Sequence, residues 1–181
     1  TTWWPRCRPP ALLSNWRNWN PVVPEKVLRV VQALAQAQAS GVARLDAQWI
    51  LCHLLKQSRP WLLAHDQDAL PPVAAAAWPE LLARRAGGEP LAYVLGEREF
   101  CGLNLHVSPA VLVPRPETEW LVDWALECLD TAPSPDVIDL GTGSGAVALT
   151  ICHARPHAHI LATDASAEAL RVAQRNARRL G

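Results

Sequence analysis

The stretch VIDLGTGSGAVAL, residues 137–149, runs from an apolar strand-like segment through three glycines into a helix-forming segment. Glycines let a backbone approach a ligand closely, and the helix that follows offers unpaired N–H groups in its first turn. Further along, HILATDAS predicts a second strand and AEALRVAQRNARRLG a second amphipathic helix. Strand, helix, strand and helix in this order are typical of a doubly wound parallel sheet, which binds ligands beyond the carboxyl ends of its strands.

The glycine loop fits two classes of cofactor. Gly141 begins a G-x-G-x-x-[G/A] dinucleotide pattern, and the segment from Asp139 to Gly145 also fits the acidic-x-G-x-G-x-G pattern of S-adenosylmethionine sites. Asp164 follows the second strand, where a carboxylate can accept hydrogen bonds from the ribose of either cofactor. Asp139 favours S-adenosylmethionine, because a carboxylate attracts its ammonium group and repels a pyrophosphate. The predicted cofactor-binding residues are Asp139, Gly141, Thr142, Gly143, Ser144, Gly145 and Asp164.

The composition argues against several other classes of protein. Half of the 181 residues are hydrophobic and the formal net charge is zero, which does not indicate a nucleic-acid-binding surface. The five cysteines form no C-x-x-C pair, so we expect reduced thiols, no metal site and a cytoplasmic location, with a mitochondrial location as the alternative. No apolar run reaches the roughly 18 residues of a membrane span. Ser144 does not lie in G-x-S-x-G, so a hydrolase nucleophile is unsupported.

The N-terminal half divides into a tail and a helical region. Residues 1–24 contain four Trp, five Pro and no acidic residue, and we interpret them as a loosely ordered tail of uncertain origin. Residues 25–88 contain four amphipathic segments and predict a small helical bundle, which we interpret as a docking domain. We expect one face of the second helix to turn inward, with Leu45, Trp49, Cys52 and Leu55. In the fourth helix we expect a proline, Pro79, in the first turn.

Residues 89–116 predict a β-hairpin connector. Residues 93–95 are strand-like, Gly96 and Glu97 suggest the turn, and alternating apolar residues from Leu103 to Val107 suggest the second strand. Two flanking prolines then hold Arg115 in extended backbone. From Glu117 onward we expect a helix that begins the last domain, residues 117–181. We expect its inward face to carry Leu121, Trp124 or Ala125, and Cys128.

Two segments together carry a family resemblance. EPLAYVLGEREFCGLNLHVSPAVLVPRPETEWLV, residues 89–122, precedes DLGTGSGAVAL, residues 139–149. This combination resembles the peptide chain release factor glutamine methyltransferases (HemK/PrmC-like) over residues 25–181. The resemblance implies methyl transfer from S-adenosylmethionine to the glutamine side-chain amide in the Gly-Gly-Gln loop of a release factor. It also implies an α/β fold in which a small helical bundle and a β-hairpin connector precede the start of a class I, Rossmann-like methyltransferase domain.

The resemblance also implies where the site residues lie. The glycine loop, residues 141–145, matches the cofactor loop of the family, and Asp164 matches its ribose-binding acid. Arg115, Glu117 and Glu119 match a connector near the site. We assign these three no individual chemical role, because an ion-paired segment that fixes domain orientation explains them equally well.

One motif of the family does not occur among the 181 residues. This is Asn-Pro-Pro-Tyr, which grips the target amide, so no catalytic residue can be named here. We therefore interpret the chain as an N-terminal portion that is inactive alone, with one sheet edge and one sheet face uncovered. The expected partner of this monomer is a release factor, with no direct contact to nucleic acid and no membrane. The alternatives are a nicotinamide-dependent oxidoreductase, a nucleic-acid amino-methyltransferase and a non-catalytic module that docks release factors.

Overall fold

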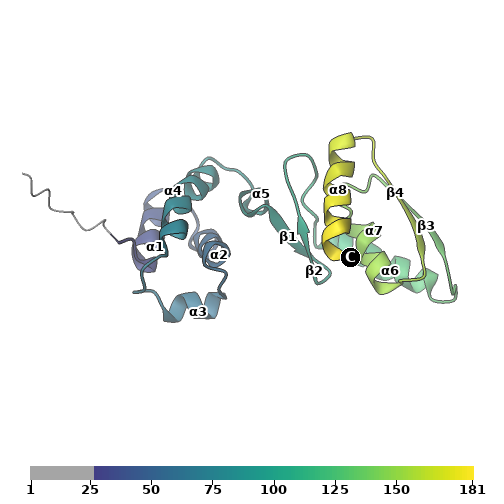
Figure 1. Ribbon diagram of the computed structural model, residues 1–181, viewed down its shortest axis with the longest axis horizontal. Helices are drawn as coiled ribbons and strands as arrows, with labels where there is room; N and C mark the ends of the chain where they lie inside the picture. The colour runs from purple at the N-terminus through teal and green to yellow at the C-terminus, as the bar shows by residue number, and fades with distance from the viewer. Residues whose placement is uncertain (1–26) are drawn as a thin grey trace, which may run out of the picture.

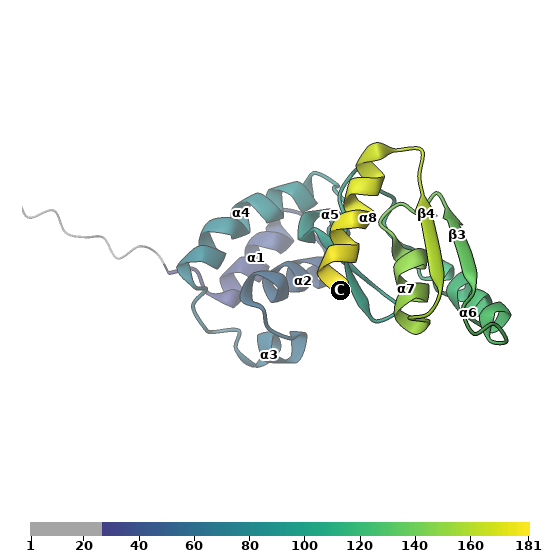
Figure 2. The ribbon, with the colours of Figure 1, turned by 45° about the vertical axis from the view of Figure 1, so that its right-hand side comes forward.

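The computed structural model describes residues 27–181, so the interpretation of residues 1–24 lies outside the described residues. The molecule is elongated (Figure 1): a helical bundle forms one end, an α/β unit forms the other, and a two-stranded hairpin lies between them. Figure 2 shows the same arrangement after a rotation, with α8 beside the hairpin and α7 beside the parallel strands. The predicted order of helical bundle, hairpin connector and α/β unit is therefore confirmed.

The helical bundle contains the helices α1 Val30–Ala39, α2 Arg44–Leu55, α3 Arg59–Ala64, α4 Pro72–Ala86 and α5 Leu91–Leu95. The α3 helix begins where the Ser58 hydroxyl accepts a hydrogen bond from the Trp61 backbone N–H at 3.4 Å. The bundle encloses one apolar core, and its largest buried residue is Trp78, whose indole Nε1–H donates to Gln36 at 3.0 Å. This bond satisfies the polar atom that burial of a tryptophan would otherwise leave unpaired.

One expectation for the bundle is partly wrong and another is wrong. In α2, Cys52 is buried and Leu55 packs on the core as expected, but Leu45 and Trp49 are 49% and 45% exposed and Ile50 and Leu51 are fully buried instead. Apolar residues surround this helix on most sides, so their spacing did not determine which face turns inward. The α4 helix begins at Pro72, so Pro79 lies inside the helix and not in its first turn. The alanine-rich segment before Pro79 favours helix strongly enough to extend the helix backward.

The second strand of the hairpin lies where expected, but the first strand and the turn lie further along the chain. Tyr93 and its neighbours, predicted as a strand, form the short helix α5, which packs on the bundle through Val94 and ends at Gly96 with a φ of +71°. The hairpin consists of β1 Glu97–Phe100 and β2 Leu103–His106, which pair antiparallel. Cys101 and Gly102 form its two-residue loop, with φ values of +46° and +79°. A type I′ turn needs positive φ at both positions, and Cys-Gly is not its common sequence.

The α/β unit contains α6 Glu117–Leu129, β3 Asp136–Leu140, α7 Ala146–Ala154, β4 His159–Thr163 and α8 Ala167–Leu180. Strands β3 and β4 pair in parallel, as predicted. The expected inward face of α6 is wrong for three residues, because Leu121 and Trp124 are 48% and 62% exposed and Cys128 is also exposed. Val122 points into the core instead, and Ala125, the expected alternative to Trp124, is partly buried beside it.

The buried residues of the hairpin share a core with the α/β unit. Phe100 and Leu105 share a core with Val122 of α6 and Ile151 of α7. A smaller cluster joins Val107 and the following loop to α8. Among residues 27–181, α7 packs on β3 and β4, and the apolar side chains of the other face are exposed. These side chains are Ile138, Leu140 and Leu161, which are 63%, 80% and 58% exposed.

Candidate functional site

The glycine loop connects the carboxyl end of β3 to the first turn of α7. The backbone N–H groups of Gly141 and Thr142 both donate to the Thr163 carbonyl oxygen, at 2.9 and 2.8 Å, so the loop is tied to the end of β4. The Gly145 N–H donates to the Thr142 carbonyl oxygen at 2.8 Å and closes the loop. All three glycines have positive φ, which L-residues adopt only at a cost of about 1–2 kcal/mol.

Two carboxylates flank the loop, one from the end of each strand. Asp139 Oδ2 accepts hydrogen bonds from the Thr142 hydroxyl at 2.7 Å and from the Ala148 N–H at 3.3 Å. The second carboxylate, Asp164, accepts from the Ser166 N–H and from the Gly143 N–H, both at 2.9 Å. These two hydrogen bonds, that from Ser166 first, lower the pKa of Asp164. The site therefore carries an ionised carboxylate at neutral pH beside the glycine loop.

The glycines differ in the space around them. A Cβ added at Gly141 or Gly143 would meet no atom within 4 Å, so a ligand can lie directly against the backbone there. At Gly145 an added Cβ would lie 2.9 Å from Leu149 Cδ1, so this glycine serves the packing of α7. The hydroxyl residues of the loop, Thr142 and Ser144, are 7% and 2% exposed. The structure thus brings all seven predicted residues to the carboxyl ends of β3 and β4, but three of them, Thr142, Ser144 and Gly145, are buried.

One buried polar residue of this region was not predicted. Asn176 of α8 is fully buried, and its side chain donates to the Ser144 carbonyl oxygen at 2.9 Å. It continues the buried stripe of Ala169, Val172 and Ala173 at helical spacing. A polar residue within an apolar stripe was the sequence signal that could have identified it.

The proline-rich connector contacts the hairpin through one carboxylate. Glu119 accepts a hydrogen bond from the Cys101 backbone N–H at 3.3 Å, which joins α6 to the hairpin turn. Arg115 and Glu117 are exposed, and the structure records no ion pair for either of them among residues 27–181. The idea of an ion-paired segment is therefore not supported, and the segment is held by its backbone and by Glu119.

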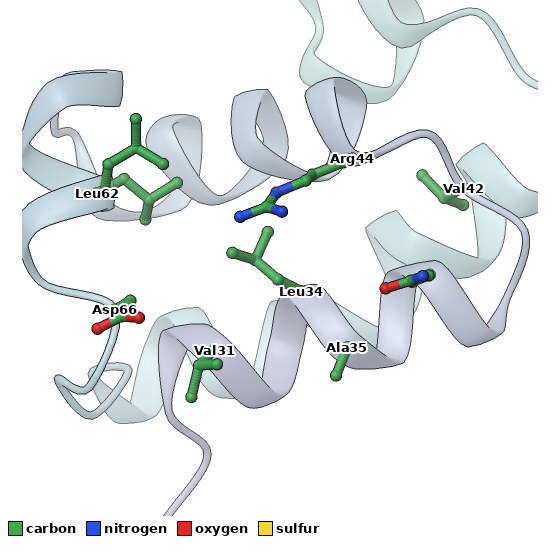
Figure 3. A pocket seen from close by; sticks show the side chains of 9 residues that line it. Val31, Leu34, Ala35, Val42, Arg44, Leu62 and Asp66 are labelled. Carbon is green, nitrogen blue, oxygen red and sulfur yellow. The ribbon is translucent and has the colours of Figure 1, made fainter.

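The two cavities described for residues 27–181 lie away from the glycine loop. One, of about 500 Å³, is an apolar groove between α1 and α3, with Val31, Leu34 and Leu62 on its walls (Figure 3). Arg44 and Asp66 extend their charged groups along it (Figure 3). The other, of about 760 Å³, lies between α2 and the hairpin.

Two further kinds of feature are absent among residues 27–181. Among residues 27–181 there is no group of three His, Cys, Asp or Glu side chains that could hold a metal ion. None of the helices in this range is both long enough and apolar enough to span a bilayer.

Comparison with known proteins matches both ends of the described chain. The sequence model of the PrmC N-terminal domain matches residues 27–96, and that of the methyltransferase small domain matches residues 122–181. Release factor glutamine methyltransferase of Bordetella pertussis is 52% identical over 141 residues. The chain belongs to the release factor glutamine methyltransferase family. The first match ends where α5 ends and the hairpin begins, so the bundle with α5 corresponds to the N-terminal domain of the family.

Other members of the release factor glutamine methyltransferase family give the same picture. The protein of Burkholderia pseudomallei is 49% identical over 143 residues, and that of Escherichia coli is 44% identical over 149 residues. These alignments cover 79% and 82% of this chain but 50% and 53% of the relatives; for B. pertussis the shares are 78% and 52%. The chain thus spans about half the length of the curated relatives that it matches.

Proposed function

We propose that the protein takes part in the S-adenosylmethionine-dependent methylation of a glutamine side-chain amide in the Gly-Gly-Gln loop of a peptide chain release factor. The observation that carries this proposal is the glycine loop with a carboxylate at each flanking strand end, in a chain of this family. The relatives are named for release factors, which supports the choice of substrate. The protein acts as a monomer in the cytoplasm, where translation terminates.

The residues present fit the cofactor. The open space beside Gly141 and Gly143 admits a ligand against the backbone, and Asp164 supplies the acid for two ribose hydroxyls. Both hydrogen bonds recorded for the Asp139 side chain end on Oδ2, which leaves Oδ1 to attract the ammonium of the methionine moiety. Thr142 and Ser144 contribute backbone shape, because their side chains are buried. The bound cofactor supplies an electrophilic methyl group on a sulfonium.

This chain's residues bind and orient; none of them is assigned to the target amide. An amide nitrogen is a weak nucleophile, so the acceptor must be held in line by hydrogen bonds. The Asn-Pro-Pro-Tyr motif that does this in the family does not occur in the 181 residues. We therefore expect no methyl transfer by the 181-residue chain alone.

The activity test uses a chimera. The part of the B. pertussis relative beyond the matched region is joined after Gly181, and the chimera is assayed beside the 181-residue chain with release factor and labelled S-adenosylmethionine. We expect labelled glutamine from the chimera only. Transfer at comparable rates by both proteins would contradict the assignment of amide positioning to the unmatched half. Tight binding of a reduced nicotinamide dinucleotide, without binding of S-adenosylmethionine, would favour the oxidoreductase instead.

The helical bundle is proposed to dock the release factor, and the groove of Figure 3 offers the test surface. Val31 lines this groove and is 38% exposed, so Val31→Glu places a charge in it without disturbing the core. In the chimera we expect a KM for release factor at least fivefold higher, with kcat and cofactor affinity unchanged. Val73→Glu, on an 83% exposed position of α4 outside the groove, is the matched control. If the two variants change the KM for release factor equally, the groove is not the docking surface.

A further inference from the structure

Asn176 has a fully buried side chain with every donor hydrogen in use. Its Oδ1 accepts from the His106 backbone N–H at 2.7 Å, and its Nδ2 donates to the His106 and Ser144 carbonyl oxygens, both at 2.9 Å. The amide of Asn176 thus pairs with both backbone groups of His106, as a residue of a neighbouring strand would. A leucine would fill similar space, but it would leave these backbone groups unpaired, which is costly in a buried place.

These bonds join segments that are far apart in the sequence. His106 ends β2, Ser144 lies within the glycine loop, and Asn176 lies on α8. The neighbouring arginines strengthen the contact with β2: Arg175 lies 3.1 Å from His106 Nε2, and Arg179 donates to the Asn104 carbonyl oxygen. His106 Nδ1 contacts the Gly96 carbonyl oxygen, so it carries the proton and Nε2 accepts from Arg175. The α8 helix therefore holds the hairpin and the loop together.

The bond to Ser144 fixes one peptide plane of the loop at both ends. Its carbonyl oxygen accepts from Asn176, and the N–H of the same peptide, on Gly145, donates to Thr142. The peptide between Thr142 and Gly143 is likewise held, because its N–H donates to Asp164. Within residues 141–145, only the Ser144 N–H has no recorded hydrogen-bond partner. The peptide between Gly143 and Ser144 is thus the one whose N–H is left for a ligand.

We propose that Asn176 is a positioning residue: it fixes the Ser144 peptide group of the cofactor loop and couples that loop to strand β2 of the hairpin. The proposal rests on the function proposed above, because the loop is taken to bind S-adenosylmethionine. A shift of the hairpin would reach the Ser144 carbonyl oxygen through the Asn176 side chain, so we expect cofactor affinity to depend on this contact. Asn176 acts through the backbone and is not a catalytic residue.

The test uses the 181-residue chain labelled with ¹⁵N, with the variants Asn176→Ala and Asn176→Asp. Gln174→Ala, at an exposed position of the same helix, is the control. In Asn176→Ala we expect amide exchange at His106 and Gly145 to be at least tenfold faster, with exchange in α1–α4 unchanged. We also expect at least fivefold weaker binding of S-adenosylmethionine, followed by chemical shifts on titration. Gln174→Ala should match the parent in both measurements.

Asn176→Asp separates positioning from a structural role. An ionised aspartate keeps the acceptor for the His106 N–H but has no donor, whereas its protonated form regains one donor. Cofactor affinity of this variant, relative to Asn176→Ala, should therefore rise as the pH falls. His106 and Arg175, which face this position, are present in both variants, so the comparison cancels their effects.

Three outcomes would overturn the inference. The first is a cofactor affinity in Asn176→Ala within twofold of the parent. The second is an equal acceleration of exchange throughout the chain, helical bundle included, which would indicate a purely structural role. The third is an identical pH dependence of Asn176→Asp and Asn176→Ala. A parent chain that binds no S-adenosylmethionine would instead overturn the proposed function, and the inference with it, so the two failures are distinguishable.

Discussion

Gly145 is the most constrained residue of the glycine loop. Its φ is +84°, and a Cβ would lie 2.9 Å from Leu149 Cδ1 and 3.3 Å from Ala173 Cβ. Gly143 has a φ of +56° but open space around it. Both positions require a backbone conformation that favours glycine, but only Gly145 also requires the absence of a side chain for α7 and α8 to pack.

Alanine substitutions separate these two requirements. We expect Gly143→Ala to lower the free energy of unfolding by about 1 kcal/mol, from backbone strain alone. Gly145→Ala should lower it by about 2–4 kcal/mol, because overpacking adds to the strain. Urea denaturation of the 181-residue chain and of each variant measures both values. Equal losses of unfolding free energy in the two variants would mean that the side chains around Gly145 move aside at no cost in free energy.

Asp164 makes the stability of the glycine loop depend on pH. Hydrogen bonds from Ser166 and Gly143 lower its pKa in the folded state. Its contribution to stability is therefore complete above the unfolded pKa of about 3.9 and is lost as the pH falls through the lower, folded pKa. We expect the Gly143 amide NMR signal to titrate with a midpoint below about 3.9. Asp164→Asn, which cannot ionise, should abolish the titration. In the parent chain, a midpoint above about 3.9 would mean that the hydrogen bonds to Asp164 do not lower its pKa.

At the scale of an element, α4 contains an unfavourable residue that packing overrides. Pro79 lies within the helix and is exposed, whereas the adjacent Trp78 is fully buried. A proline inside a helix removes one backbone hydrogen bond and costs about 3 kcal/mol. Burial of Trp78 and of Leu82, one turn later, offsets that cost.

Replacement of this proline should stabilise the bundle. We expect Pro79→Ala to raise the free energy of unfolding by about 1–3 kcal/mol, because the helix regains a hydrogen bond and a better helix former. Thermal and urea unfolding followed by helical circular dichroism measure the change. Ala76→Gly, at an exposed position of the same helix, should lower stability by about 1 kcal/mol and serves as the control. A less stable Pro79→Ala variant would show that Pro79 stabilises the conformation that α4 adopts.

At the scale of the whole molecule, the bundle and the α/β unit meet over a small junction. Next to the α5–β1 connection, His53 of α2 contacts Glu97 of β1 at 2.9 Å. Burial acts to raise the pKa of Glu97, but hydrogen bonds from Asn104 and His53, with nearby positive charge, outweigh it and lower the pKa. The two ends of the molecule have separate main cores, with the hairpin in the core of the α/β unit, and a small third cluster contains residues of both α5 and α8.

The open face of the parallel sheet governs how the 181-residue chain behaves in solution. Leu140 is 80% exposed on this face, in a sheet that has only two strands among residues 27–181. We expect the chain to self-associate at high concentration and Leu140→Glu to reduce this association, measured by sedimentation velocity. Leu112→Glu changes a 72% exposed leucine outside the strands and should have little effect. A monomeric parent chain at all concentrations would contradict this expectation.

The sequence by itself determined the local features of the site. An apolar strand, three glycines and a helix-forming segment specify the loop, because the requirement for positive φ acts within a few residues. The parallel pair of strands and the position of Asp164 followed from the same periodicity, and the resemblance supplied the order of the domains. These features are encoded in short stretches of sequence, so local patterns of residues suffice to predict them.

Tertiary structure decided which faces turn inward and how distant segments meet. The α2 and α6 helices have apolar residues on several sides, so only their neighbours determine that Ile50 and Val122 are buried while Trp49 and Trp124 are exposed. Residues 93–95 form helix because Val94 packs on the bundle, although their composition favours strand. Asn176 reaches His106 across 70 residues of chain. Such contacts depend on the packing of whole elements, which no local pattern of residues encodes.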